Sequence, residues 1–223
     1  PSYDDGTQMS FAFTGYSAAG NLSGSDDGRG LLLTGDNAGA LSTRYFQTPM
    51  TGDVWAVAAV RHASNSGGDV LFWFDTSGSG GQANTFVGLR AGDDAVMRYS
   101  GAQATNSALN SALSNLLFVT RVRMNYSGVL DGVDFWVKFE GSDVSSIGAL
   151  GSPMLTNEGS DIFGTTLNYI ALSGGGQSGG IDVIRVADGP SAFTEVMTGV
   201  PEPSSLATLL LGAALLMRRR FGA

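Results

Sequence analysis

Apolar and polar residues alternate over short runs along most of this chain, which is the period of a β-strand with one buried face. The runs 54–60 (VWAVAAV) and 70–74 (VLFWF) are apolar at every position, as expected of strands in the middle of a sandwich. Turn-forming Gly-Asp, Ser-Gly and Gly-Gly pairs separate most of the runs. The pattern predicts strands at 9–14, 31–34, 41–47, 54–61, 70–75, 85–90, 95–99, 116–125, 134–140, 167–172 and 181–186.

Helical patterns are rare in this chain. Only 103–116 and 191–197 fit a helix, and both segments are short. No period of about 20 to 50 residues repeats, which excludes solenoids and propellers. Many short strands without long helices predict one all-β domain at 1–199, built as a two-sheet antiparallel sandwich.

The pattern changes near the C-terminus, where a turn, an apolar run and a basic cluster follow one another. These parts are Pro201, Glu202 and Pro203, the run 206–217, and the cluster Arg218, Arg219 and Arg220. A twelve-residue helix is roughly 18 Å long, which is short for a hydrocarbon core of roughly 30 Å. A core-packed helix is the alternative, but such a helix would be amphipathic, whereas this run is apolar all round. The positive-inside bias puts the arginines in the cytoplasm and residues 1–199 across the membrane.

The C-terminal segment resembles the PEP-CTERM sorting signal of Gram-negative bacteria, which has the same three parts in the same order. The resemblance implies a boundary between a domain at 1–199 and a signal at 200–223. It also implies cleavage near the motif by an exosortase, a membrane-embedded cysteine protease, after transient insertion of 206–217 in the inner membrane. Delivery to the cell surface or the exopolysaccharide matrix would follow. Export needs a signal peptide, and because the sequence starts at Pro1 we expect that leader to have been removed.

Charge and cysteine content exclude several classes of partner and of stabilising site. Without the three terminal arginines, nine basic residues face 20 acidic ones, a formal net charge of −11. Such an acidic chain is not expected to bind nucleic acid or anionic membrane surfaces. The absence of cysteine excludes disulfides and thiolate metal sites, so stability must come from the core.

Several strand motifs of the domain resemble those of concanavalin A-like (laminin-G-like) jelly rolls. The matching pieces are FTGY at 13–16, NLSG at 21–24, DVWA at 53–56, LFVTRV at 117–122, DFWV at 134–137 and IDVIRV at 181–186. The resemblance implies a curved two-sheet jelly-roll sandwich of a kind often used to bind glycans or protein ligands, sometimes with Ca²⁺.

The predicted hairpin of 117–125 and 134–140 carries the candidate ligand-binding residues. If the loop 127–132 sets the register, Arg123 lies opposite Trp136 and Arg121 opposite Lys138, and a half-exposed indole edged by charges results. Such a ring can cover the apolar face of a sugar while charged groups bind its hydroxyls. The alternative is a solvated sheet face on which Arg123 covers the ring through a cation–π contact. The candidate residues are Trp136, Arg121, Arg123, Asp134, Lys138 and Glu140.

Acidic loops raise the question of calcium, which prefers six to eight oxygen ligands. The candidate pairs are Asp26 with Asp27, Asp93 with Asp94, and Asp131 with Asp134. None has the spacing of an EF-hand loop, and turn-favouring surface aspartates explain the pairs equally well. We therefore assign no metal ligand and no cofactor, and leave Ca²⁺ open.

Catalytic signatures are weak, and we assign no catalytic residue. No Glu-x-Asp-x-x-Glu strand occurs, and Glu140, Glu158 and Glu195 are far apart in sequence, whereas a retaining glycosidase needs two carboxyls about 5 Å apart. The single histidine, His62, is most simply the last residue of a buried strand.

The sequence thus predicts an exported, exosortase-processed cell-surface or matrix protein that is not an enzyme. Its domain would have a structural, adhesive or glycan-binding role, with exopolysaccharide as the candidate ligand. The alternative is an envelope polysaccharide hydrolase or lyase on the same fold.

Overall fold

A computed structural model of the chain describes residues 3–8, 13–15, 29–35, 41–62, 69–75, 85–90, 94–99, 102–106, 109, 114–128, 130–174 and 176–199. The strands are β1 (Tyr3–Gln8), β2 (Arg29–Gly35), β3 (Leu41–Met50), β4 (Asp53–His62), β5 (Val70–Asp75), β6 (Thr85–Arg90), β7 (Asp94–Tyr99), β8 (Ala102–Asn106), β9 (Asn115–Ser127), β10 (Leu130–Phe139), β11 (Leu155–Ser160), β12 (Leu167–Gly174) and β13 (Gly176–Asp188). The helices are α1 (Ile147–Leu150) and α2 (Ala192–Thr198).

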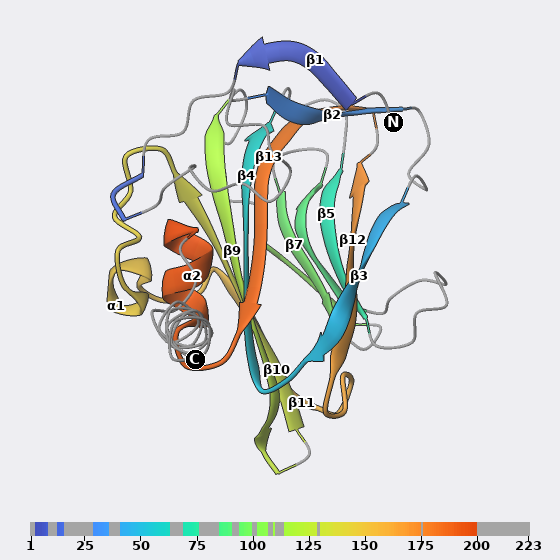
Figure 1. The fold of residues 1–223 in the computed structure, drawn as a ribbon, viewed down its shortest axis with the longest axis vertical. Coiled ribbons are helices and arrows are strands. Elements are labelled where there is room, and N and C mark those ends of the chain that lie inside the picture. Colours follow the sequence, from blue (N-terminus) through green and yellow to red (C-terminus); the bar gives the residue numbers. More distant parts are fainter. Residues whose placement is uncertain are drawn as a thin grey trace, which may run out of the picture.

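The strands form two antiparallel sheets that pack face to face (Figure 1). One sheet has seven strands in the order β1-β2-β13-β4-β9-β10-β11, and the other has six in the order β3-β12-β5-β6-β7-β8. All pairings between these strands are antiparallel, and β5 to β8 form a meander of consecutive neighbours. The predicted all-β, two-sheet jelly-roll sandwich is therefore confirmed.

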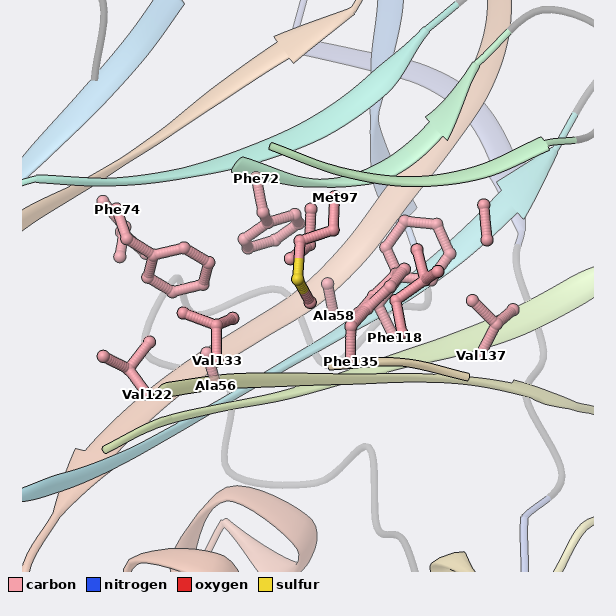
Figure 2. Packing of buried hydrophobic residues seen from close by; sticks show 14 of the residues in the cluster. Ala56, Ala58, Phe72, Phe74, Met97, Phe118, Val122, Val133, Phe135 and Val137 are labelled. Atoms are coloured by element: carbon pink, nitrogen blue, oxygen red, sulfur yellow. The ribbon is translucent and has the colours of Figure 1, made fainter. Parts of the chain in front are cut away.

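The main core lies between the two sheets (Figure 2). Phe72, Phe74 and Met97 point inward from the six-stranded sheet and meet Phe118 and Phe135 of the other sheet. The rings of Phe118 and Phe135 are 5.4 Å apart in an edge-on arrangement. Alternate residues of β9 and β10 supply this layer, so the faces predicted from the period of two are correct.

A second apolar layer covers the outer face of the seven-stranded sheet. Helix α2 packs there, and the segment around α1 lies beside it (Figure 1). The buried residues of this layer are Phe13, Trp55, Val57, Ala59, Leu117, Val119, Trp136, Val144, Leu150, Ala192, Val196 and Met197. The 54–60 run is apolar on both faces because β4 has a core on each side, as predicted for a central strand.

Hydrogen bonds hold the segments that pack on this outer layer in place. Thr14 N–H donates to the Ser142 carbonyl at 3.2 Å, and Val144 N–H donates to the Thr14 carbonyl at 2.8 Å. A Cβ on Gly15 would lie 2.3 Å from Ser145 Cα, so this crossing needs glycine. The Arg185 side chain of β13 donates to the Val196 and Met197 carbonyls in the last turn of α2.

Most predicted strands agree with the structure, with one correction. The predicted helix at 103–116 is wrong, because β8 occupies 102–106 and pairs with β7 through backbone hydrogen bonds. Of the predicted strand at 9–14, residues 9–12 lie outside the described residues, and Thr14 makes an isolated bridge to Asp143. Strand β1 at Tyr3–Gln8 was not predicted. Strand β11 was not predicted, because LTNEGS has little β-propensity and gains its order from pairing with β10. The predicted helix at 191–197 is confirmed as α2.

The predicted sorting segment, including Pro201–Pro203, the run 206–217 and Arg218–Arg220, lies outside the described residues. Over the part of the chain that the structure describes, neither helix has the length and apolar character needed to cross a bilayer.

Candidate functional site

The hairpin that carries the candidate residues has a different register from the predicted one. Arg123 pairs with Gly132 and Arg121 pairs with Asp134, so each arginine is four positions from its predicted partner. The strands continue further than expected, to Ser127 and from Leu130, and a turn at Gly128 (φ 77°) joins them. A shift of four residues keeps every side chain on its face but moves it along the sheet, so the period of two could not detect it.

Trp136 is buried, which contradicts the predicted half-exposed platform. Its exposed fraction is 5%, and its ring stacks on Trp55 with centroids 5.8 Å apart and planes 19° apart. The indole Nε1–H donates to the Gly151 carbonyl at 2.9 Å. The ring lies on the predicted face, but Trp55 and the segment around α1 bury it there. Trp136 therefore serves the second apolar layer and presents no surface to a sugar.

Lys138 and Glu140 lie away from the two arginines. Lys138 Nζ donates to the Leu150 carbonyl, at the end of α1, and burial lowers the pKa of Lys138. Glu140 Oε2 accepts a hydrogen bond from Asn115 Nδ2 at 3.1 Å. Lys138 thus anchors the segment around α1, and Glu140 bonds to the start of β9, so the two candidate residues do not join a common site.

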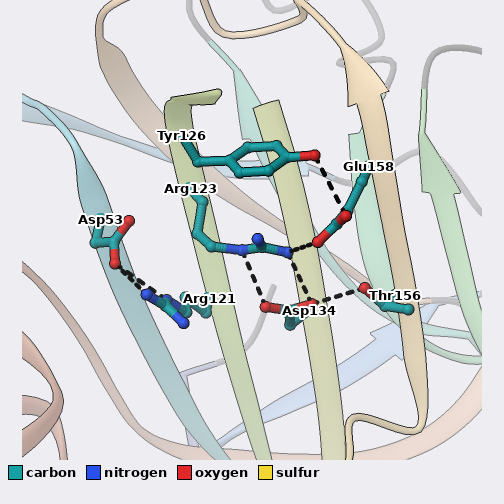
Figure 3. Close-up of polar contacts among 7 residues, drawn as sticks. All are labelled: Asp53, Arg121, Arg123, Tyr126, Asp134, Thr156 and Glu158. Atoms are coloured by element: carbon teal, nitrogen blue, oxygen red, sulfur yellow. Dashed lines mark hydrogen bonds and ion pairs between the residues drawn. The ribbon is translucent and has the colours of Figure 1, made fainter. Parts of the chain in front are cut away.

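The structure does bring Arg123 and Asp134 together, in a polar group on the outer face of β9, β10 and β11 (Figure 3). We call Arg123, Tyr126, Asp134, Thr156 and Glu158 the Tyr126 cluster. Arg123 Nε lies 3.2 Å from Asp134 Oδ2, and its Nη2 donates to Asp134 Oδ1 at 3.2 Å and to Glu158. Thr156 Oγ1 donates to Asp134 Oδ1 at 2.7 Å, and Tyr126 OH donates to Glu158 Oε2 at 3.3 Å.

The Tyr126 cluster is stacked in layers. The Arg123 guanidinium lies 4.6 Å from the centroid of the Tyr126 ring. The guanidinium also lies close to Gly132, where a Cβ would come within 2.9 Å of Arg123 Nη2. Glycine at 132 thus gives the guanidinium room against β10, and the ring covers it. Arg123 is therefore a half-buried support, while Tyr126 (40% exposed) and the Glu158 side chain (48% exposed) form the accessible surface.

Arg121, the other predicted arginine, belongs to a neighbouring group. Its Nε donates to Asp53 Oδ2 at 3.1 Å, and its guanidinium lies 5.4 Å from the Trp55 ring centroid. This pair lies beside the Tyr126 cluster (Figure 3), and through Trp55 it touches the apolar layer on the outer face of the sheet.

The charges of the Tyr126 cluster set its protonation. Hydrogen bonding and charge from Arg123 lower the pKa of Glu158, so this carboxyl is ionised at neutral pH. Partial desolvation and the Glu158 carboxylate raise the pKa of Tyr126, so the phenol keeps its proton. The accessible surface therefore offers an aromatic ring, a hydroxyl group and a carboxylate.

Of the calcium candidates, Asp131 and Asp134 have protein partners. The buried Asp131 carboxylate accepts backbone N–H bonds from Asn125 at 2.9 Å and from Ile162 and Phe163 at 2.6 Å. It thereby ties the start of β10 to the loop before β12. Among the described residues no three His, Cys, Asp or Glu side chains converge as a metal site requires. Asp26, Asp27 and Asp93 lie outside the described residues.

No catalytic arrangement is found among the described residues. The run Gly176-Gln177-Ser178-Gly179-Gly180 has the Gly-x-Ser-x-Gly spacing of a nucleophile elbow, but it lies inside β13 and pairs with β2 instead of forming a strand-to-helix turn. His62 is the last residue of β4, as expected.

Sequence reasoning missed Tyr126, Glu158 and Thr156. Tyr126 follows the predicted strand by one position, although it lies within the observed strand β9. The alternation that puts Arg121 and Arg123 on one face continues to position 125, so it gave no reason to place Tyr126 beside them. The other two lie in β11, which gave no strand signal. Only the pairing of β11 with β10 brings Glu158 opposite Gly132 and within reach of Arg123.

No protein-family model and no curated protein sequence matches the chain. Several solved structures are similar in fold. They include a tetrameric galectin from the ball sponge Cinachyrella sp. (9% identity, TM-score 0.40, covering 67% of this chain and 96% of that one) and chicken galectin 2 (12% identity, TM-score 0.39, 65% and 97%). Another is the bifunctional GH43-CE protein of Bacteroides eggerthii (15% identity, TM-score 0.43, 73% of this chain and 22% of that one). At these identities and TM-scores we transfer no function from them.

Proposed function

We propose that this chain is an exported, non-catalytic glycan-binding protein of the bacterial cell surface or extracellular matrix, made as a membrane-inserted precursor. The observation that carries the glycan-binding role is the exposed Tyr126 ring, which packs on Arg123 and has the Glu158 carboxylate at its edge. An aromatic face packs against the C–H face of a sugar, and the carboxylate accepts its hydroxyl protons. Because the side chains are already bound to one another, little conformational entropy is lost when a ligand arrives.

The route to the surface rests on the resemblance of the C-terminal segment to a PEP-CTERM signal. Helix α2 ends at Gly199, whose φ of 71° and N–H bond to the Glu195 carbonyl close it two residues before Pro201. This cap supports a division into a folded domain at 1–199 and a signal at 200–223. The partners in this proposal are an exosortase and, through 206–217, the inner membrane for a limited time.

Intact-mass measurement of surface-released protein tests the route. In a strain with active exosortase the chain should end near residue 200, and in a strain without it the tail should remain. A released protein that still carries Arg218–Arg220 in the active strain contradicts the sorting proposal.

Binding is favoured over hydrolysis and lyase chemistry by the direction of the pKa shifts. A glycosidase general acid needs a carboxyl with a raised pKa, whereas the pKa of Glu158 is lowered by Arg123. A tyrosine acting as the base of a lyase needs an easily ionised phenol, whereas the pKa of Tyr126 is raised. Both groups are in the protonation state that suits hydrogen bonding.

Glycan-array screening followed by calorimetric titration tests the binding role. Tyr126→Ala should weaken binding about tenfold or more, because stacking on an aromatic ring is lost. Phe139→Ala is the matched control, since Phe139 is another exposed aromatic of the hairpin (37% exposed), and it should leave affinity unchanged. Absence of any glycan ligand, or equal affinity of the Tyr126→Ala variant, contradicts glycan binding at this site. Release of reducing or unsaturated sugar ends by the wild-type protein would favour the alternative enzyme.

A further inference from the structure

The charges around Tyr126 are not balanced, and the imbalance falls on the most accessible group. Arg123 and Asp134 form an ion pair in which both side chains are shielded, with exposed fractions of 14% and 10%. Arg121 and Asp53 form a second pair beside it. Because Arg123 pairs with Glu158 as well, two arginines face three carboxylates, which leaves one net negative charge on the group. Glu158 presents that charge to solvent, since its side chain is the most exposed of the three carboxylates.

The arginine of the cluster is not presented to a ligand. Its guanidinium packs against the Tyr126 ring and close to Gly132, and its Nε and Nη2 groups face Asp134 and Glu158. An anionic sugar would therefore meet the Glu158 carboxylate without gaining a free cation, and the formal net charge of −8 adds to its repulsion.

Glu158 keeps room for a partner of its own. One of its oxygens bonds to Arg123 and the other to Tyr126 OH at 3.3 Å, and a carboxylate has about four acceptor positions. The Glu158 carboxylate lies beside the hydroxyl end of the Tyr126 ring (Figure 3). A sugar stacked on the ring can thus place a substituent next to a carboxylate that is held in the ionised state.

We propose that the Tyr126 cluster selects polysaccharides that carry free amino groups, such as de-N-acetylated hexosamine units, over neutral and uronate-containing ones. The sugar's C–H face packs on Tyr126, and its ammonium group donates to Glu158. The ammonium lies at the edge of the ring, because the opposite face of the ring already carries the Arg123 cation. This assignment rests on the proposed glycan-binding function and names the ligand class of that site.

Calorimetric titration of the whole protein with three oligosaccharides of matched length tests the assignment: glucosamine oligomers, N-acetylglucosamine oligomers and oligogalacturonate. At low ionic strength the amine oligomer should bind about three- to tenfold tighter than its acetylated form, the range of a partly exposed charge-assisted contact. The preference should shrink as salt is added, because the Debye length falls to about 10 Å at 0.1 M. Oligogalacturonate should bind weakest.

Two variants with the same change in net charge separate a local contact from general attraction. Glu158→Gln should abolish the preference for the amine while stacking is kept, so both hexosamine oligomers then bind alike. Glu140→Gln removes another exposed carboxylate, in the turn that follows β10, and should leave the preference unchanged. Thermal melts of both variants establish that they are folded, and Gly132→Ala, whose Cβ displaces the Arg123 guanidinium, should weaken binding of both hexosamine oligomers.

The outcomes distinguish this assignment from the function on which it rests. Equal affinity of the wild-type protein for amine and acetylated oligomers overturns the amine preference and leaves glycan binding standing. An equal loss of the preference for the amine oligomer in Glu140→Gln and Glu158→Gln also overturns the assignment, since attraction by overall charge would then be the cause. If none of the three oligosaccharides binds the wild-type protein, the assignment and glycan binding by this cluster both fail.

Discussion

Replacing Trp136 with alanine gives the sharpest test of how the outer face of the seven-stranded sheet is used. The ring is 5% exposed, stacks on Trp55 with centroids 5.8 Å apart, and donates to the Gly151 carbonyl at 2.9 Å. Helix α2 contacts the same layer, since Phe193 meets the Trp55 ring edge-on with centroids 5.0 Å apart. Removing the indole therefore leaves a cavity beneath the cover and an acceptor without its donor.

The cost follows from these contacts. Truncation of a buried tryptophan to alanine costs about 3–5 kcal/mol. In a domain of about 200 residues each kcal/mol moves the melting temperature by about 2–4 °C. We therefore expect Trp136→Ala to melt roughly 6–20 °C below the wild-type protein.

Circular dichroism melts, with urea denaturation at a fixed temperature, measure this loss. Trp136→Phe is the first control: it keeps an aromatic ring against Trp55 but removes the indole N–H, and should cost about 1–3 kcal/mol. Phe139→Ala is the second, and because Phe139 is 37% exposed its cost should stay within about 1 kcal/mol. A Trp136→Ala protein that melts with the wild type would refute the packing of this ring and restore it as a surface group.

Three further predictions concern other contacts. The stability difference between the wild-type protein and Glu158→Gln should be largest above the unfolded-state glutamate pKa of about 4.3. Because Arg123 lowers the pKa of Glu158 in the folded state, the difference should vanish as pH falls through that lowered value. A difference that stays constant in melts from about pH 7 to pH 3 contradicts this. Gly88→Ala should destabilise by about 1–3 kcal/mol or more in urea titrations, because its Cβ would lie 2.0 Å from a backbone carbonyl oxygen of β5, whereas Gly148→Ala has no close neighbour and should be near neutral. Arg185→Met should raise the amide hydrogen-exchange rate in α2, because two carbonyls of its last turn lose the Arg185 donor that lies 3.0 and 3.3 Å away. An unchanged exchange rate would show that apolar packing alone holds the helix.

The sequence by itself determined the fold class and the faces of the strands. In β9 and β10 the alternation places Phe118 and Phe135 in the core and Arg121 and Trp136 on the other face, as observed. The runs at 54–60 and 70–74 are apolar throughout because each strand has an apolar layer on both sides. Alternation is a local property, since neighbouring side chains of a strand must point to opposite faces.

Tertiary structure alone decided which part of the outer face is buried and which groups meet there. Trp136 is buried against Trp55, which precedes it by about eighty positions, and against Gly151 at the end of α1, and nothing in the hairpin's own sequence records these contacts. Arg123 lies opposite Gly132 instead of Trp136, because a register shift by an even number of residues leaves the alternation unchanged. Glu158 reaches Arg123 through the pairing of β10 with β11, a strand of low intrinsic propensity. Register and cover depend on contacts between segments distant in sequence, so a pattern read along one strand contains neither.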